Sequence, residues 1–174
     1  SNIYILIMII VTILAGFIGF IDDYLKIKNK NKDGLKGKFK VTGQIVIGII
    51  VSYIIITNDS VVVRNFSDEI TSESIKNGVE YFDTKDLITT IPFIKDNEFN
   101  YNWLLPNSFE DYTWLIYCLV IIFIITAVSN GANITDGLDG LAAGTSAIVG
   151  ITLSIFIYLS GNIIFSDYLN ILYI

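Results

Sequence analysis

The stretch Asn133-Ile-Thr-Asp-Gly-Leu-Asp-Gly-Leu-Ala-Ala-Gly144 places two carboxylates, Asp136 and Asp139, between two long apolar runs. Charged side chains beside lipid are costly, so they usually serve a function. If both lie in the first turn of a helix, their i,i+3 spacing puts them on one face, and Gly137 and Gly140 let a bulky ligand approach the backbone. The amino end of that helix would offer N–H groups and a positive dipole to a phosphate. Carboxylates for a metal beside a helix start for phosphate favour phosphoryl chemistry.

The composition is typical of an integral membrane protein rather than a soluble domain. The 174 residues are 53% hydrophobic, with a mean hydropathy of +0.63. A net charge of −6 argues against nucleic acid as a partner. The chain contains no histidine, and its single cysteine, Cys118, lies in an apolar run where a small buried side chain is expected. Because the chain starts at Ser1 in mid-pattern and ends in an apolar run, we expect it to be a fragment.

Four uncharged apolar runs predict four transmembrane helices, since about 20 residues cross a hydrocarbon core. The predicted spans are residues 3–21, 41–57, 114–130 and 141–159. The predicted fold is therefore an all-α polytopic membrane protein, with these four helices forming part of a larger bundle. The tail from 160 to 174 is expected to be extracytoplasmic or to start another hydrophobic element.

The loop between the first two spans sets the topology. Residues 22–40 hold seven lysines against three aspartates, so the positive-inside rule predicts that this loop is cytoplasmic. The loop 130–140 then faces the same side, and the segment 58–113 faces the other. That segment holds eleven acidic and four basic residues. Alternating polarity near 61–63, 87–94 and 99–105 predicts short strands. We interpret it as a small β-containing extracytoplasmic insert that acts as a solvated connector, in preference to a docking module.

The cytoplasmic loops bring four carboxylates to one side of the membrane: Asp22, Asp23, Asp136 and Asp139. On a continuing helix, Lys26 lies i,i+4 from Asp22 and i,i+3 from Asp23, where it can pair with either or reach a phosphate. If the four share one pocket they repel unless a cation joins them. Oxygen ligands without histidine or thiolate favour Mg²⁺ or Mn²⁺, with Asp22, Asp23 and Asp136 as candidate ligands. The alternative is that these aspartates only cap helices and end spans.

Three stretches carry a resemblance to a known family. They are Gly19-Phe-Ile-Asp-Asp-Tyr-Leu-Lys26, then Gly34-Leu-Lys-Gly-Lys-Phe-Lys40 followed by Gln44, and Asn133-Ile-Thr-Asp-Gly-Leu-Asp-Gly-Leu-Ala142. In this order the chain resembles the polyprenyl-phosphate N-acetylhexosamine-1-phosphate transferases, and among them the muramoyl-pentapeptide branch. The resemblance covers nearly the whole chain and is least secure over 58–113.

The resemblance implies transfer of phospho-MurNAc-pentapeptide from its UDP carrier to undecaprenyl phosphate, which gives lipid I and UMP with Mg²⁺ as cofactor. It also implies a multi-pass protein of the bacterial cytoplasmic membrane with its active site on the cytoplasmic face, and suggests a homodimer. Asp22 and Asp23 match the family's aspartate pair, assigned to binding or activating the lipid phosphate. Lys26 matches its partner lysine near the diphosphate. These three are the predicted catalytic residues.

The resemblance also implies a set of substrate-binding residues. Lys38 or Lys40 matches a further basic position. Asn133, Asp136 and Asp139 match the segment that lines the uridine-diphosphate side, where Asn133 and Asp136 are expected to contact the nucleotide and Asp139 to orient the site. The predicted set is Lys38, Lys40, Asn130, Asn133, Asp136, Gly137 and Asp139. The family's metal-binding aspartate and its histidine-rich motif would lie beyond Ile174, so we expect this chain by itself to be inactive.

Two other functions stay open on the sequence. A sibling enzyme that transfers GlcNAc-1-phosphate shares the same motifs, although Lys26 and Thr135 favour the muramoyl branch. From another class, a cation transporter or a non-catalytic membrane scaffold would use the four aspartates as an ion path. That function predicts polar residues inside the spans, and spans 3–21 and 41–57 contain very few.

Overall fold

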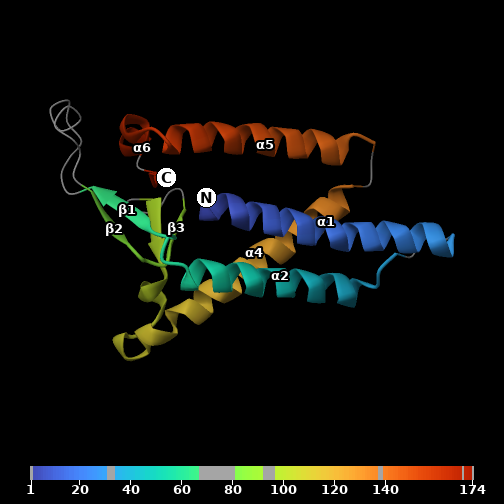
Figure 1. The fold of residues 1–174 in the computed structure, drawn as a ribbon, viewed down its shortest axis with the longest axis horizontal. Helices are drawn as coiled ribbons and strands as arrows, with labels where there is room; N and C mark the ends of the chain where they lie inside the picture. The colour runs from blue at the N-terminus through green and yellow to red at the C-terminus, as the bar shows by residue number, and fades with distance from the viewer. Residues whose placement is uncertain are drawn as a thin grey trace. The chain divides into compact units, whose positions relative to one another are not determined.

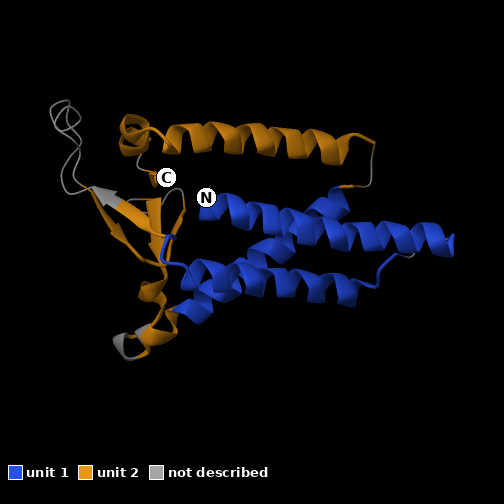
Figure 2. Ribbon diagram, in the orientation of Figure 1, with its two compact units in different colours: residues 1–61, 114–135 blue, residues 62–113, 136–174 orange. Residues whose placement is uncertain are grey.

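The structure is a computed structural model that describes residues 2–30, 34–66, 81–91, 97–136, 139–169 and 171–173 (Figure 1). The helices are α1 (Ile3–Asn29), α2 (Gly37–Thr57), α4 (Thr113–Thr135), α5 (Leu141–Ser160) and α6 (Ile163–Leu169). The strands are β1 (Val63–Phe66), β2 (Tyr81–Thr84), β3 (Ile88–Thr90) and β4 (Glu98–Asn100). The chain divides into two compact units, one of residues 1–61 and 114–135, the other of residues 62–113 and 136–174 (Figure 2).

Among the residues that the structure describes, four helices, α1, α2, α4 and α5, are long and apolar enough to cross a membrane, which confirms the predicted number of spans. Helix α1 extends past the predicted span, through Asp22 and Lys26 to Asn29. Lys26 and Lys28 lie in its last turn, where positive charge suits the negative end of the helix dipole. Lys30 then adopts a left-handed conformation that ends the helix. The first charged motif therefore lies on a helix and not in a loop.

In the first unit, α2 contacts both α1 and α4 through small residues. A Cβ atom added to Gly43 would lie 2.6 Å from Cδ1 of Ile18 on α1. One added to Gly48 would lie 2.9 Å from the Cα atom of Ile122 on α4. Membrane helices lack a hydrophobic driving force between them, so close approach at small residues supplies much of their packing. Ile47 is buried at the same level of α2.

In the described part of the second unit, β1 pairs with β2 and β3 pairs with β4 in two antiparallel hairpins, which confirms a β-containing insert. The predicted strand over 99–105 was wrong beyond Asn100, because residues 101–104 form a 3-10 helix, η2 (Tyr101–Leu104). The Asn100 side chain accepts a hydrogen bond from the Asn102 N–H, and this local bond competes with strand pairing. A second 3-10 helix, η3 (Asn107–Tyr112), leads into α4. The end of the predicted strand 87–94 lies outside the described residues.

The connection between α4 and α5 corrects two predictions. Asn130 and Asn133 lie on α4, which runs to Thr135, and not in a loop. Asp136 and Asp139 do not lie in the first turn of a helix, because Gly140 has φ +83 and α5 begins only after it. A left-handed residue cannot continue a right-handed helix, so both carboxylates lie in the connection. The bond from the Gly144 N–H to the Gly140 carbonyl, 2.8 Å, closes the first turn of α5.

Candidate functional site

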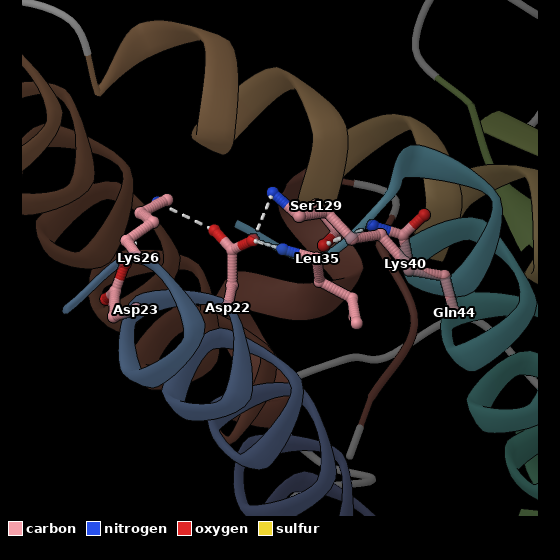
Figure 3. A network of polar contacts seen from close by, with 7 residues as sticks. All are labelled: Asp22, Asp23, Lys26, Leu35, Lys40, Gln44 and Ser129. Atoms are coloured by element: carbon pink, nitrogen blue, oxygen red, sulfur yellow. Dashed lines mark hydrogen bonds and ion pairs between the residues drawn. The ribbon is translucent and has the colours of Figure 1, made fainter. Parts of the chain in front are cut away.

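Asp22 is the buried centre of a polar cluster at the charged end of α1 (Figure 3). Only 5% of the residue is exposed. Lys26, one turn later, places its Nζ atom 2.7 Å from Asp22 Oδ2 and 3.0 Å from Asp23 Oδ1. The pairing expected from the i,i+4 and i,i+3 spacings is therefore confirmed. A buried carboxylate needs such partners because its charge loses the solvation that water provides.

The second oxygen of Asp22 holds the following loop and the next helix. Oδ1 accepts a hydrogen bond of 2.6 Å from the Leu35 N–H, and it lies 2.9 Å from Nζ of Lys40 on α2. Gly34 lies so close that an added Cβ atom would meet the Asp22 carboxylate and lie 2.8 Å from the Lys26 side chain. The glycine of the second motif is therefore required by the close passage of the loop over Asp22.

The two neighbouring aspartates have different environments. The side chain of Asp22 is 7% exposed, whereas that of Asp23 is 73% exposed. Asp22 contacts two ammonium groups and a backbone N–H, and Asp23 contacts Lys26. The Asp22 carboxylate is thus buried and occupied by contacts within the protein, while the Asp23 carboxylate is accessible to a ligand at this end of the helix.

A second group of polar contacts joins α2 to α4. The Gln44 Nε2 donates to Ser129 Oγ at 2.9 Å, and its Oε1 accepts from the Asn130 Nδ2 at 3.0 Å. Asn130 Nδ2 also donates to the Thr126 carbonyl at 2.8 Å. The sequence motifs include Gln44 but predict no role for Ser129. The available signal was a carboxamide in an otherwise apolar span, because such groups bond across membrane helices.

These groups surround a cavity of about 110 Å³ between α1, α2 and α4. Its polar wall consists of Asp22, Lys40, Gln44, Ser129, Asn130 and Asn133. The remaining wall is apolar and includes Ile18, Ile47 and Ile125. The cavity therefore joins the charged pair of Asp22 and Lys40 to the carboxamide contacts between α2 and α4.

The other predicted site residues lie at different places. Lys38 is exposed in the first turn of α2, so Lys40, and not Lys38, is the lysine that reaches Asp22. Asp136 and Asp139 are exposed and belong to the second unit. A pocket shared by all four carboxylates stays a prediction. Gly137 lies outside the described residues.

The carboxylates of the first unit suit a magnesium ion only together with phosphate oxygens. Within the described residues no group of three His, Cys, Asp or Glu side chains is placed to hold a metal. Mg²⁺ commonly takes one or two carboxylates and completes its shell with water and substrate phosphates. Asp23, which is mostly exposed, fits that requirement better than Asp22, whose oxygens already face two lysines.

Comparison with known proteins identifies the family of the chain that carries this cluster. Residues 5–174 match the model of glycosyl transferase family 4. The chain belongs to this family. Among curated family relatives, it is 54% identical to the phospho-N-acetylmuramoyl-pentapeptide-transferase of Amoebophilus asiaticus, over 100% of this chain and 44% of the relative. It is 51% identical to that of Flavobacterium psychrophilum, with the same coverage. It is 44% identical to that of Parabacteroides distasonis, over 100% of this chain and 42% of the relative.

The chain therefore spans less than half the length of these glycosyl transferase family 4 relatives. The family match covers both charged motifs and the four apolar helices, so the resemblance expected from the motifs is confirmed. Together these findings make the chain part of a multi-pass membrane protein.

Proposed function

We propose that the protein transfers phospho-MurNAc-pentapeptide from UDP-MurNAc-pentapeptide to undecaprenyl phosphate, forming lipid I and UMP in peptidoglycan biosynthesis. The observation that carries the proposal is the cluster at Asp22: two lysine ammonium groups within 2.9 Å of one buried carboxylate, with the exposed Asp23 beside it, at the end of a membrane helix. The relatives from Amoebophilus asiaticus and Flavobacterium psychrophilum, both phospho-N-acetylmuramoyl-pentapeptide-transferases, support it.

In the proposed reaction, an oxygen of the lipid phosphate forms a bond to the phosphorus that bears the sugar, and the bond from that phosphorus to UMP breaks. Lys26 and Lys40 hold phosphate oxygens by charge, and Asp22 fixes both ammonium groups in place. Asp23 binds or activates the lipid phosphate. A magnesium ion, when bound with the phosphates, would neutralise charge on the leaving group.

The remaining predicted residues belong to the proposed substrate-binding set, in which Asn133 and Asp136 contact the nucleotide and Asp139 orients the site. They are Lys38, Asn130, Asn133, Asp136, Gly137 and Asp139. The proposal includes the bacterial cytoplasmic membrane as the location, with the site on its cytoplasmic face, because residues 22–40 are rich in lysine. A homodimer, implied by the family resemblance alone, is part of the same proposal.

The test uses the full-length protein in detergent and measures UMP release from UDP-MurNAc-pentapeptide with undecaprenyl phosphate and Mg²⁺. Asp23→Asn and Asp136→Asn should each abolish Mg²⁺-dependent release. Asp59→Asn, which changes an exposed aspartate beyond the other end of α2, is the matched control and should leave release unchanged.

Two results would overturn the assignment. Release from UDP-GlcNAc, without release from the muramoyl donor, would move the protein to the sibling transferases. No release from either donor would return the aspartates to a structural or transport role.

A further inference from the structure

Gln44 is a buried polar side chain that the proposed reaction does not use. The residue is 5% exposed and lies within the membrane helix α2. Both ends of its carboxamide bond to α4, through Ser129 at 2.9 Å and Asn130 at 3.0 Å. Burying an amide without hydrogen bonds raises the free energy of the folded protein. The packing of α2 against α4 that forms both bonds is therefore favoured over packings that break them.

The same packing of α2 against α4 also determines where the Lys40 side chain lies. Gln44 follows Lys40 by four residues, so the two side chains lie on the same face of α2, one turn apart. Both line the cavity between α1, α2 and α4, and Figure 3 shows them beside Ser129 and Asp22. A rotation of α2 that broke the bonds of Gln44 would also turn Lys40 away from Asp22, 2.9 Å from it on α1.

We infer that Gln44 is a positioning residue: its carboxamide, bonded to Ser129 and Asn130, holds α2 in the rotation that places the Lys40 ammonium group on Asp22. The consequence for catalysis rests on the proposed function, in which Lys40 holds a phosphate. The geometric consequence does not, because the contact between Lys40 and Asp22 exists without substrate.

The first experiment measures the geometry without any enzymatic assay. In the full-length protein, Gln44→Met keeps the length and most of the volume of the side chain but removes both bonds to α4. The acylation rate of Lys40 by an N-hydroxysuccinimide ester, measured by mass spectrometry relative to the exposed Lys28, should rise several-fold. Ser52→Ala is the matched control, because Ser52 is 1% exposed on the same helix but bonds the carbonyl of Gly48 in its own helix, so it should leave Lys40 unchanged.

The second experiment measures transfer. Gln44→Met should lower kcat/KM roughly tenfold, the size expected when about two buried hydrogen bonds are lost. If Gln44 acts through Lys40, the double variant with Lys40→Ala should be no worse than Lys40→Ala alone, since coupled residues are not additive.

The outcomes separate the inference from the proposed function. Unchanged labelling of Lys40 in Gln44→Met, or additive losses in the double variant, would overturn the positioning role. A full-length protein inactive with both donors, in which Gln44→Met still exposes Lys40, would refute the proposed function and support the positioning.

Discussion

The ammonium group of Lys40 lies 2.9 Å from Oδ1 of Asp22, although the two residues belong to different helices. The same carboxylate pairs with Lys26 on its own helix and accepts the Leu35 N–H from the loop. One buried charge therefore joins α1, the loop and α2. This gives Asp22 a structural role that its neighbour Asp23 does not share.

Substitutions of the two aspartates should differ in their effect on the free energy of unfolding, although both should abolish activity. Asp22→Asn removes the charge that two lysines face, so we expect a loss of roughly 2 kcal/mol in the free energy of unfolding, together with loss of activity. Asp23→Asn changes a mostly exposed pair, so it should cost less than about 1 kcal/mol while still abolishing transfer. Thermal unfolding of the full-length protein in detergent, beside the UMP assay, measures both. Equal destabilisation by the two variants would contradict the structural difference between them.

Gly34 should tolerate no side chain, whereas Gly37 should. A Cβ atom at Gly34 would meet the Asp22 carboxylate and the Lys26 side chain, so Gly34→Ala should displace the loop. We expect a loss of about 1–3 kcal/mol and more than tenfold lower activity, by overpacking and loss of the Leu35 bond. Gly37→Ala meets nothing within 4 Å and lies at the start of α2, so thermal unfolding should show it neutral or slightly stabilising. A Gly34→Ala variant as stable as Gly37→Ala would show that the loop does not need to pass so close to the Asp22 carboxylate.

The sequence predicted the helices and the contacts within a helix, but not the contacts between helices. Length and hydropathy are enough to identify four spans, and the spacing of Asp22 and Lys26 is enough to pair them. The pairing of Lys40 with Asp22 depends on how α1 and α2 approach each other, which involves Gly43 and Ile18. The pattern of residues along one helix does not predict how closely, or through which residues, two helices pack.

The connection before α5 shows a different limit. Asp136 and Asp139 have the spacing of one helical face, but the left-handed Gly140 delays the helix until Leu141. Glycine makes such a conformation inexpensive, and nothing in the spacing of the aspartates reveals it. Gly140 therefore sets the start of α5, and its role in leaving room for a ligand stays a prediction.

The contact between α2 and α4 should depend on Gly48 more than the contact with α1 depends on Gly43. At Gly48 an added Cβ atom would lie 2.9 Å from backbone Cα of Ile122, which cannot move alone. At Gly43 it meets the flexible end of Ile18, which can rotate away. We expect Gly48→Ala to cost about 1–3 kcal/mol and Gly43→Ala less, measured by thermal unfolding in detergent. The opposite order would mean that α2 packs differently from this structure.

The ion pair of the insert should make its hairpin sensitive to acid. Arg64 Nε lies 2.8 Å from Asp83 Oδ1 and Nη2 lies 3.1 Å from Oδ2, between residues that face each other in β1 and β2. The guanidinium also lies over the Tyr81 ring, 4.1 Å from its centroid. The hydrogen bonds from Arg64 lower the pKa of the Asp83 carboxyl below its ordinary value. The stabilisation is therefore fully present above that ordinary pKa, and it is lost as pH falls through the lower pKa of the folded hairpin.

Pepsin cleavage of the insert provides the measurement, because pepsin works in the acidic range where Asp83 titrates. Asp83→Asn cannot titrate, so it should be cut faster than the natural protein near pH 4.5, and the ratio of the two rates should approach one toward about pH 2. The other carboxylates titrate in both proteins, so their effects largely cancel in the ratio. Because the pair is partly exposed, salt should reduce the difference at pH 4.5. A ratio that does not change with pH would mean that Arg64 does not stabilise the hairpin through the Asp83 charge.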